Sequence, residues 1–274
     1  MFELVARKPR FWTQSGAFLR LRFAQHTATL RLMKLANVRN LLARLKPRPV
    51  YRLKDALLAL LPDQNARYVF LDIGANHGQS AADLSNLFPN ARIICFEPIE
   101  RLAQEIEVRF HDNPNIEVER AAVGAAPGVQ EFNLTSFDQA GSFLRLGGSY
   151  QKIGITHTGT VSVAVESVDE YCARRGIDRI HFAKIDTQGY SREVLQGAQR
   201  LLRDGSIDVL KVEYLLGDYY DRKDSFFEIE ALIHPFGYRL YTFVETDTDI
   251  VGSGCVEGKS GALAYVDAIY RLVR

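Results

Sequence analysis

The sequence predicts an α/β fold in which a mostly parallel β-sheet carries helices on both faces. Three observations support this prediction. From about residue 68, short apolar or β-branched runs alternate with helical patterns, as in chains whose parallel strands are joined by helices. The run at 68–73 ends in the loop GANHG, which is typical of a strand that leads into a helix. With 274 residues, 47% of them hydrophobic, the chain can bury one sizeable core.

Each element is predicted from its local pattern. Apolar runs predict parallel strands over residues 68–73, 92–96, 116–123, 180–185 and 209–214. Helical periodicity between and after these runs predicts helices over residues 80–87, 102–110, 168–175, 191–203 and 225–233. Two antiparallel strands, 129–134 and 160–166, are expected to flank a loop rich in Gly and Ser. Residues 237–243 and 262–266 are expected to close the sheet with an antiparallel edge.

Residues 1–50 differ from the rest of the chain in charge. They contain eleven Lys or Arg and one acid, Glu3, whereas the formal charge of the whole chain is +1, so the remaining residues carry about −9. Apolar residues at intervals of three and four predict one or two amphipathic helices that end before Pro47. We therefore expect a basic helical arm at 1–50 and an α/β domain at 51–274.

Three roles are open for this basic arm. It can pack on its own domain or on a second subunit of a homo-oligomer, with its arginines in solvent. It can bind an anionic membrane surface, for which Phe11, Trp12 and Phe18 lie near Arg20. A nucleic-acid role has only the basic charge in its favour, because no recognition motif accompanies it.

Cysteine usage and hydropathy predict a cytoplasmic protein. Cys95, Cys172 and Cys255 are far apart and form no CxxC pair, so neither a disulfide framework nor a thiolate metal site is expected. Arginines interrupt the apolar runs of the N-terminus, unlike in a secretory signal, and no run reaches a membrane-spanning length. Peripheral contact with the inner membrane surface through residues 1–50 stays open.

The loop GANHG at 74–78 is predicted to bind a nucleotide, because ligands of parallel sheets bind beyond the carboxyl ends of the strands. A dinucleotide site would need GxGxxG, but Asn76 stands where the second glycine would be. Asp72 would repel a pyrophosphate and suits a positively charged ligand such as S-adenosylmethionine. Glu97 ends the next strand, where its carboxylate is placed to accept hydrogen bonds from both ribose hydroxyls.

An ordered set of motifs resembles one family. The segments are FLDIGANHGQS, ICFEP, AAVG, VESVDEY, IHFAKIDTQGYSREVLQGA and KVEY, and over about residues 68–214 they resemble the FkbM family of S-adenosylmethionine-dependent methyltransferases. The resemblance implies a Rossmann-like class I methyltransferase fold and O-methylation activity. It also implies a set of cofactor-binding residues, with the last two near the adenine: Asp72, Gly74, Asn76, Gly78, Glu97, Ala122 and Val123. The chain departs from the family at Gln188 and Ser191, where members commonly have acids.

Asp186 and Glu213 are the main candidates for catalysis. Each ends a predicted strand, so both carboxylates are expected at the same sheet edge as the cofactor loop. They can serve as a general base, as groups that orient the acceptor, or as ligands of Mg²⁺, for which no third ligand is identified. His77 in the cofactor loop is the third candidate, and His157 in the Gly/Ser-rich loop is a further histidine that a covering loop would bring in.

The acceptor is predicted only as a class. Tyr214, Tyr219 and Tyr220 follow the fifth strand and predict an aromatic wall against a sugar ring or a lipid-linked glycan. The expected function is methyl transfer from S-adenosylmethionine to a hydroxyl group of a glycan, glycolipid or secondary metabolite. The alternative is a non-catalytic nucleotide-binding module that docks to a partner or a membrane through its basic arm.

Overall fold

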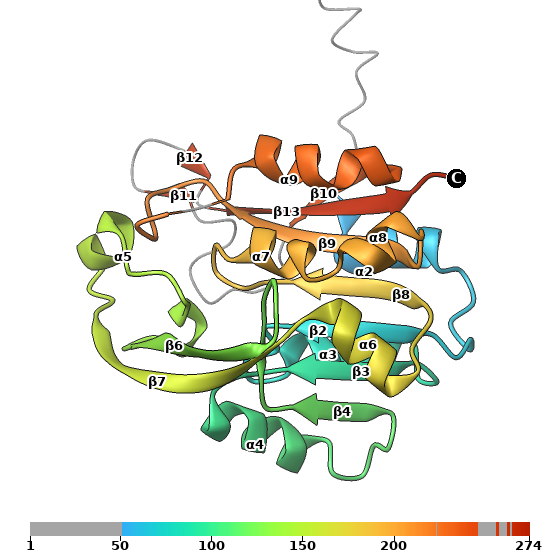
Figure 1. Cartoon of the computed structure of the whole chain (residues 1–274), viewed down its shortest axis with the longest axis horizontal. Coiled ribbons are helices and arrows are strands. Elements are labelled where there is room, and N and C mark those ends of the chain that lie inside the picture. Colours follow the sequence, from blue (N-terminus) through green and yellow to red (C-terminus); the bar gives the residue numbers. More distant parts are fainter. Residues whose placement is uncertain (1–50, 223, 246–255, 258–261, 264) are drawn as a thin grey trace, which may run out of the picture. The chain divides into compact units, whose positions relative to one another are not determined.

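The structure is a computed structural model that describes residues 51–222, 224–245, 256–257, 262–263 and 265–274. The predicted basic arm at 1–50 and Cys255 lie outside these residues. Within them, eight strands form one sheet in the order β1-β10-β13-β9-β8-β2-β3-β4 (Figure 1). The bounds are β1 (Tyr51–Arg52), β2 (Val69–Ile73), β3 (Arg92–Phe96), β4 (Ile116–Glu119), β8 (Ile180–Ile185), β9 (Ile207–Leu215), β10 (Tyr238–Glu245) and β13 (Tyr265–Leu272).

Strand direction confirms the predicted mostly parallel sheet. Every neighbouring pair is parallel except the two pairs made by β13, which runs antiparallel to β9 and β10. The predicted strand at 262–266 is displaced. Ala262–Leu263 forms β12, which pairs with β11 (Val256–Glu257). The antiparallel strand β13 starts at Tyr265 and lies inside the sheet, between β10 and β9. The acid Asp267 interrupts the apolar pattern of β13, yet it is buried against Lys211 of β9.

Helices cover both faces of the sheet, as predicted (Figure 1). One layer contains α2 (Leu53–Leu60), α3 (Gln79–Leu87) and α4 (Glu100–Arg109), and the other contains α6 (Val168–Arg175), α7 (Ser191–Gln196), α8 (Gln199–Arg203) and α9 (Phe226–Ile233), followed by the 3₁₀ turn η2 (His234–Phe236). Phe70 of β2 packs in the core with Leu57 and Leu84 of the first layer. The adjacent Leu71 packs in the core with Leu195 and Ile229 of the second, because successive strand residues face opposite sides.

The single helix predicted at 191–203 is two helices. It divides after Gln196, where the backbone at Gly197 passes so close to Gly124 that a Cβ on Gly197 would clash with the carbonyl oxygen of Gly124. This close packing of a helix end on the loop after β5 (Ala122–Val123) is a tertiary requirement. Local helical periodicity does not reveal it.

A second, smaller sheet has the order β5-β7-β6, with β6 (Gly128–Thr135) and β7 (His157–Glu166) antiparallel, as predicted. The strand expected at 116–123 is therefore divided, because β4 belongs to the main sheet and β5 to this one. Residues 136–156, here called the insertion, connect β6 to β7 and contain the 3₁₀ turn η1 (Asp138–Ala140) and α5 (Gly148–Lys152). Its backbone is tied to the segment after β9, since Gly147 N–H donates to Tyr219 O at 2.6 Å.

Two further sequence expectations concern cysteines and membrane spans. Cys95 and Cys172 are buried as free thiols. Across the described ranges, every helix is too short or too polar to cross a bilayer.

Candidate active site

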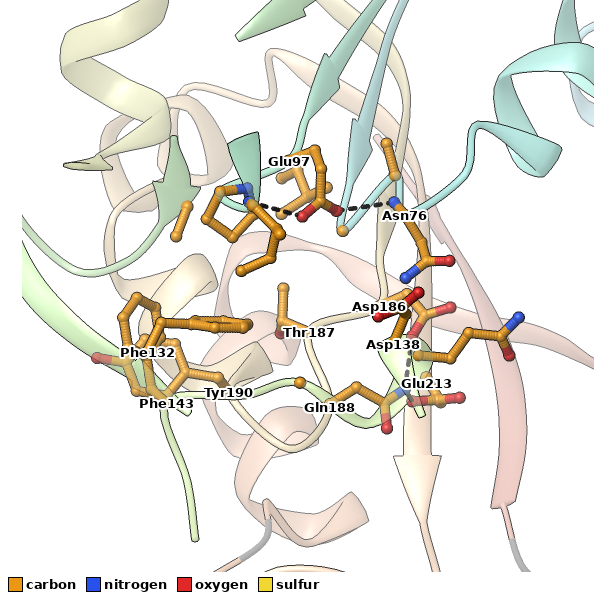
Figure 2. Close-up of a pocket in the computed structure, with 18 of the residues that line it drawn as sticks. Asn76, Glu97, Phe132, Asp138, Phe143, Asp186, Thr187, Gln188, Tyr190 and Glu213 are labelled. Atoms are coloured by element: carbon orange, nitrogen blue, oxygen red, sulfur yellow. Dashed lines mark hydrogen bonds between the residues drawn. The ribbon is translucent and has the colours of Figure 1, made fainter. Parts of the chain in front are cut away.

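A cavity of about 380 Å³ lies beyond the carboxyl ends of β2, β3, β8 and β9, with the insertion along its other side. This is the edge at which parallel sheets place their ligands. Of the residues predicted for the site, the following line the cavity: Gly74, Asn76, Glu97, Ala122, Val123, Asp186 and Glu213. Figure 2 shows Glu97 and Asn76 on one side of this space and Asp186, Gln188 and Glu213 on another.

Glu97 is held rigidly at the end of β3. Its Oε2 accepts from the backbone N–H of Asn76 at 2.9 Å, and its Oε1 accepts from that of Ile99 at 2.9 Å (Figure 2). Only 4% of the residue is exposed, and this burial raises the pKa of Glu97 to about 7. Each oxygen keeps a free lone pair, so the ionised carboxylate can accept two hydroxyl groups of one ligand.

The glycines at positions 74 and 78 of the loop are needed for close packing against the rest of the protein. Gly74 has φ of +81°, and a Cβ there would clash with the backbone carbonyl oxygen of Asp186. Gly78 lies outside the cavity lining, in the left-handed region at the N-cap of α3, where a Cβ would meet the Phe110 ring at 3.0 Å. These glycines let the loop cross the end of β8 and enter α3.

Asp72 does not reach the cavity lining. It is 0% exposed, and its Oδ1 accepts from Nζ of Lys184 at 3.0 Å. The same Nζ donates to the carbonyl oxygen of Gly74 at 2.9 Å. Asp72 therefore supports the loop through Lys184, and the geometry does not support the predicted direct contact with a ligand. Lys184 itself lines the cavity, and a lysine inside the buried run HFAKI is the sequence signal that could have identified it.

Asp186 and Glu213 are brought together by Gln188. The Nε2 of Gln188 donates to Oδ1 of Asp186 at 3.1 Å and to Oε2 of Glu213 at 3.0 Å (Figure 2). Its Oε1 accepts from the hydroxyl groups of Tyr150, at 3.2 Å, and Tyr220, at 3.1 Å. Gln188 has φ of +53°, a left-handed backbone that turns its side chain back toward the strand ends.

The two carboxyl groups differ in protonation. Burial and the charges of Asp186 and Asp267 raise the pKa of Glu213 well above its usual range. Burial also works to raise the pKa of Asp186, but the charges of Lys184 and Lys211 outweigh it and lower that pKa. Asp186 is therefore the more readily ionised of the two carboxyl groups, and Glu213 is the more readily protonated.

The predicted histidines are not brought to these carboxyl groups. His77 lies outside the cavity lining, with its Nδ1 2.7 Å from Oε2 of Glu105 and its Nε2 3.7 Å from Oδ2 of Asp138. It joins the cofactor loop to α4 and to the insertion. His157 is exposed at the start of β7. The geometry gives neither histidine access to the reacting groups.

Aromatic side chains line the cavity, but most of them differ from those predicted. Tyr219 belongs to the lining, Tyr220 is buried behind Gln188, and the hydroxyl of Tyr214 pairs with that of Tyr270 at 2.7 Å in the core. Four of the other rings come from the second sheet and the insertion, Phe132, Phe137, Phe143 and Tyr150, and three come from elsewhere, Phe96, Tyr190 and Tyr265. Figure 2 shows Phe132, Phe143 and Tyr190 grouped together. The ring centroid of Phe143 lies 5.2 Å from that of Phe132 and 4.7 Å from that of Tyr190. Sequence reasoning missed them because the path of the insertion is not encoded in local periodicity.

Two buried polar atoms in the lining have no partner. They are Oδ1 of Asn76 and Oγ1 of Thr187. Together with Glu97, they offer a ligand a carboxylate for a diol, an amide oxygen and a hydroxyl, while Ala122 and Val123 offer an apolar surface. This donor set fits S-adenosylmethionine, which carries ribose hydroxyls, a flat apolar base and a charged amino-acid end.

The residues do not fit Mg²⁺ in the same way. In the described part of the chain, no group of three or more His, Cys, Asp or Glu side chains is arranged to hold a metal ion. One oxygen of each acid, Oδ1 of Asp186 and Oε2 of Glu213, already accepts a hydrogen bond from the amide nitrogen of Gln188.

This fold and this site define a Rossmann-like, S-adenosylmethionine-dependent methyltransferase. The family model described as "Methyltransferase FkbM domain" matches residues 72–240, so the chain belongs to the FkbM methyltransferase family.

The chain is also similar to a curated relative and to solved structures. The chain is 24% identical over 186 residues to the 2-O-methyltransferase NoeI of Sinorhizobium fredii (strain NBRC 101917 / NGR234), covering 65% of this chain and 73% of that protein. It also resembles a putative sarcosine dimethylglycine methyltransferase from Galdieria sulphuraria, with TM-score 0.44, 13% identity, and coverage of 80% and 83%. A 1,6-didemethyltoxoflavin-N1-methyltransferase from Burkholderia thailandensis has TM-score 0.43, 12% identity, and coverage of 92% and 90%.

Proposed function

We propose that this protein transfers a methyl group from S-adenosylmethionine to a hydroxyl group of a glycan, glycolipid or secondary metabolite. The observation that carries the proposal is the position of the Asp186 carboxyl group, which lines the cavity beside Lys184 and Glu213 at the strand ends; the charges of the neighbouring lysines lower its pKa. A hydroxyl acceptor needs a base, because its proton must leave as the new bond forms. The name of the relative NoeI, a 2-O-methyltransferase, supports oxygen as the acceptor atom.

The chemistry of this transfer divides between cofactor and protein. The cofactor, when bound, supplies a methyl group on a sulfonium and leaves as S-adenosylhomocysteine. The protein aligns the acceptor oxygen with that methyl group and removes its proton. Asp186 accepts this proton from the acceptor hydroxyl, so the O–H bond breaks while the O–C bond forms. Lys184, with Nζ 3.6 Å from Oδ2 of Asp186, keeps the base ionised until then.

The aromatic lining supports an acceptor with flat apolar faces. Aromatic rings bind such faces with large contact area and little loss of side-chain entropy, and sugar rings present C–H groups in this way. Phe132, Phe143 and Tyr190 form one such surface in the cavity. In another part of its lining, the rings of Tyr150 and Tyr219 meet edge to face, with centroids 4.8 Å apart. This supports glycans and glycolipids ahead of small aliphatic alcohols.

The first test separates cofactor binding from transfer. We expect calorimetric titration of S-adenosylhomocysteine to show binding by the wild type that weakens about 100-fold in Glu97→Ala, since hydrogen bonds to a charged group are lost. Glu131→Ala removes an exposed glutamate and is the matched control. Asp186→Asn should keep cofactor binding, while transfer of labelled methyl groups to a panel of glycans, glycolipids and phenols falls about 10²-fold or more.

The outcomes distinguish the alternatives. Full transfer by Asp186→Asn would remove Asp186 from the mechanism. Binding of S-adenosylhomocysteine, with equal and background-level labelling by the wild type and Glu97→Ala across the panel, would instead favour a non-catalytic module.

A further inference from the structure

The side-chain amide of Gln188 bridges Asp186 and Glu213, whose side chains also form a hydrogen bond with each other. Its two N–H donors face one carboxyl group each, at 3.1 and 3.0 Å. Its oxygen faces the hydroxyl groups of Tyr150 and Tyr220. Because a flipped amide would turn its oxygen toward both carboxyl groups, these tyrosines fix the nitrogen in this position.

The surroundings already balance the charge of the acids. Charged groups from four adjacent strands face this region on one side of the sheet: Asp72 from β2, Lys184 from β8 with Asp186 directly after it, Lys211 and Glu213 from β9, and Asp267 from β13. The Nζ of Lys184 lies 3.0 Å from Oδ1 of Asp72, and the Nζ of Lys211 lies 2.7 Å from Oδ1 of Asp267. Burial raises the pKa of Asp267 as well as that of Glu213, so it favours the protonated forms of these two acids.

Two features oppose the binding of a divalent cation between these carboxyl groups: the amide of Gln188 and the ammonium of Lys184. It would have to displace the amide nitrogen from both carboxyl groups, and it would lie beside the ammonium of Lys184, which is 3.6 Å from Oδ2 of Asp186. An amide nitrogen that donates two hydrogen bonds cannot be a ligand for a hard cation.

We infer that Gln188 is a positioning residue that bridges Asp186 and Glu213 in place of a divalent cation, so that these two carboxyl groups work without a metal ion. The inference rests on the proposed function in one respect, since Asp186 is the base of that proposal. It adds how the base is held and which cofactor the site excludes. Gln188→Glu should reverse the exclusion, because a third carboxylate would then face the other two in oxygen-ligand geometry.

Manganese titration of the full chain tests the inference, since Mn²⁺ prefers the same oxygen ligands and is followed by its paramagnetic signal. We expect the wild type and the exposed control Gln104→Glu to show no site tighter than about 1 mM. Gln188→Glu should bind one Mn²⁺ per chain at least about tenfold more tightly, and the added Asp186→Asn change should remove this gain. Retained S-adenosylhomocysteine binding shows that each variant is folded.

Two results would overturn the inference. One is a single Mn²⁺ site in the wild type at submillimolar concentration that is lost in Asp186→Asn. The other is a folded Gln188→Glu chain that gains no affinity. If Gln188→Glu fails to fold, comparing Mn²⁺ titrations of the wild type and Asp186→Asn still decides whether the wild type has a Mn²⁺ site at Asp186.

A second variant tests the positioning role without any metal. Gln188→Met has a similar length but no donors, so the ionised pair loses two hydrogen bonds and its titration should move to higher pH. The readout is the carboxyl ¹³C signals of labelled Asp and Glu, with Gln104→Met as control, and an unchanged titration would refute the role. Neither measurement uses an acceptor, so the inference can stand even if the acceptor atom proves not to be oxygen.

Discussion

Glu97 shows how a single buried carboxyl group can set the pH range of a binding site. Both its oxygens accept backbone N–H groups, yet burial dominates and raises its pKa to about 7. Two ribose hydroxyls would donate to the ionised form, so binding favours loss of the proton. The affinity for a ligand with these hydroxyl groups is therefore highest above the pKa of Glu97, and it is lost as the pH falls through that pKa.

We predict that S-adenosylhomocysteine binds about tenfold more weakly at pH 6 than at pH 8, because the carboxyl group must first lose its proton. Calorimetry in two buffers of different ionisation enthalpy measures this, and it should also show proton release at and below pH 7. Glu97→Gln is the control, with weaker binding that no longer depends on pH in this range. A flat profile for the wild type would contradict the assignment of Glu97.

Individual residues also show where reasoning from the sequence stopped. Asp72, Glu97, Asp186 and Glu213 were all predicted at one sheet edge, because parallel strands end together. The structure separates them by side-chain direction, since Asp72 turns into the protein toward Lys184 while the other three line the cavity. Whether a strand-end side chain points into the cavity depends on its neighbours across the sheet, which the local sequence does not specify.

At the scale of elements, the insertion at 136–156 completes the site. Its buried contacts come from several directions: Ser142 Oγ donates to the carbonyl oxygen of Gln188 at 2.9 Å, and Tyr220 OH donates to that of Ala140 at 2.9 Å. One of the exposed contacts of the insertion is the ion pair between Arg101 and Asp138, whose side chains are 55% and 42% exposed. Buried hydrogen bonds contribute more than exposed ion pairs, so the former should hold the insertion in place.

We predict that Tyr220→Phe loosens the insertion more than Asp138→Asn does. Losing the partner of a buried carbonyl costs about 1–3 kcal/mol, whereas an exposed ion pair contributes below about 1 kcal/mol. Hydrogen exchange measured by mass spectrometry on peptides from the insertion should show faster exchange in Tyr220→Phe. Faster exchange in Asp138→Asn than in Tyr220→Phe would mean that the exposed pair is the stronger tie.

At the scale of the whole molecule, the charge asymmetry between residues 1–50 and the rest of the chain is the main unexplained feature. Among the residues that the structure describes, those that line the cavity lie between positions 73 and 265. From its charge and aromatic residues, we propose that the basic arm binds an anionic membrane surface where a lipid-linked acceptor would be presented.

We predict that a chain starting at residue 51 still binds S-adenosylhomocysteine but no longer floats with vesicles containing phosphatidylserine. Electrostatic attraction to anionic lipid, together with the aromatic residues near Arg20, is lost with the arm. Neutral phosphatidylcholine vesicles are the control. Equal flotation of the full and shortened chains would remove the arm from membrane binding.

The sequence by itself determined the order of strands and helices, the loop between β2 and α3, and the acids at the ends of β3, β8 and β9. These depend on local periodicity and on the rule that parallel strands end at one edge, so they can be read in order along the chain. The departure at Gln188 was also visible, but its consequence was not.

Only the tertiary structure decided how distant residues meet. Tyr220 reaches Gln188 across 32 positions and Asp267 reaches Lys211 across the sheet, and these contacts form the surroundings that set the pKa values of the buried acids. The aromatic lining likewise depends on where the insertion folds back. The physical reason is that burial and pairing set both side-chain direction and protonation, and each depends on contacts between residues far apart in the chain.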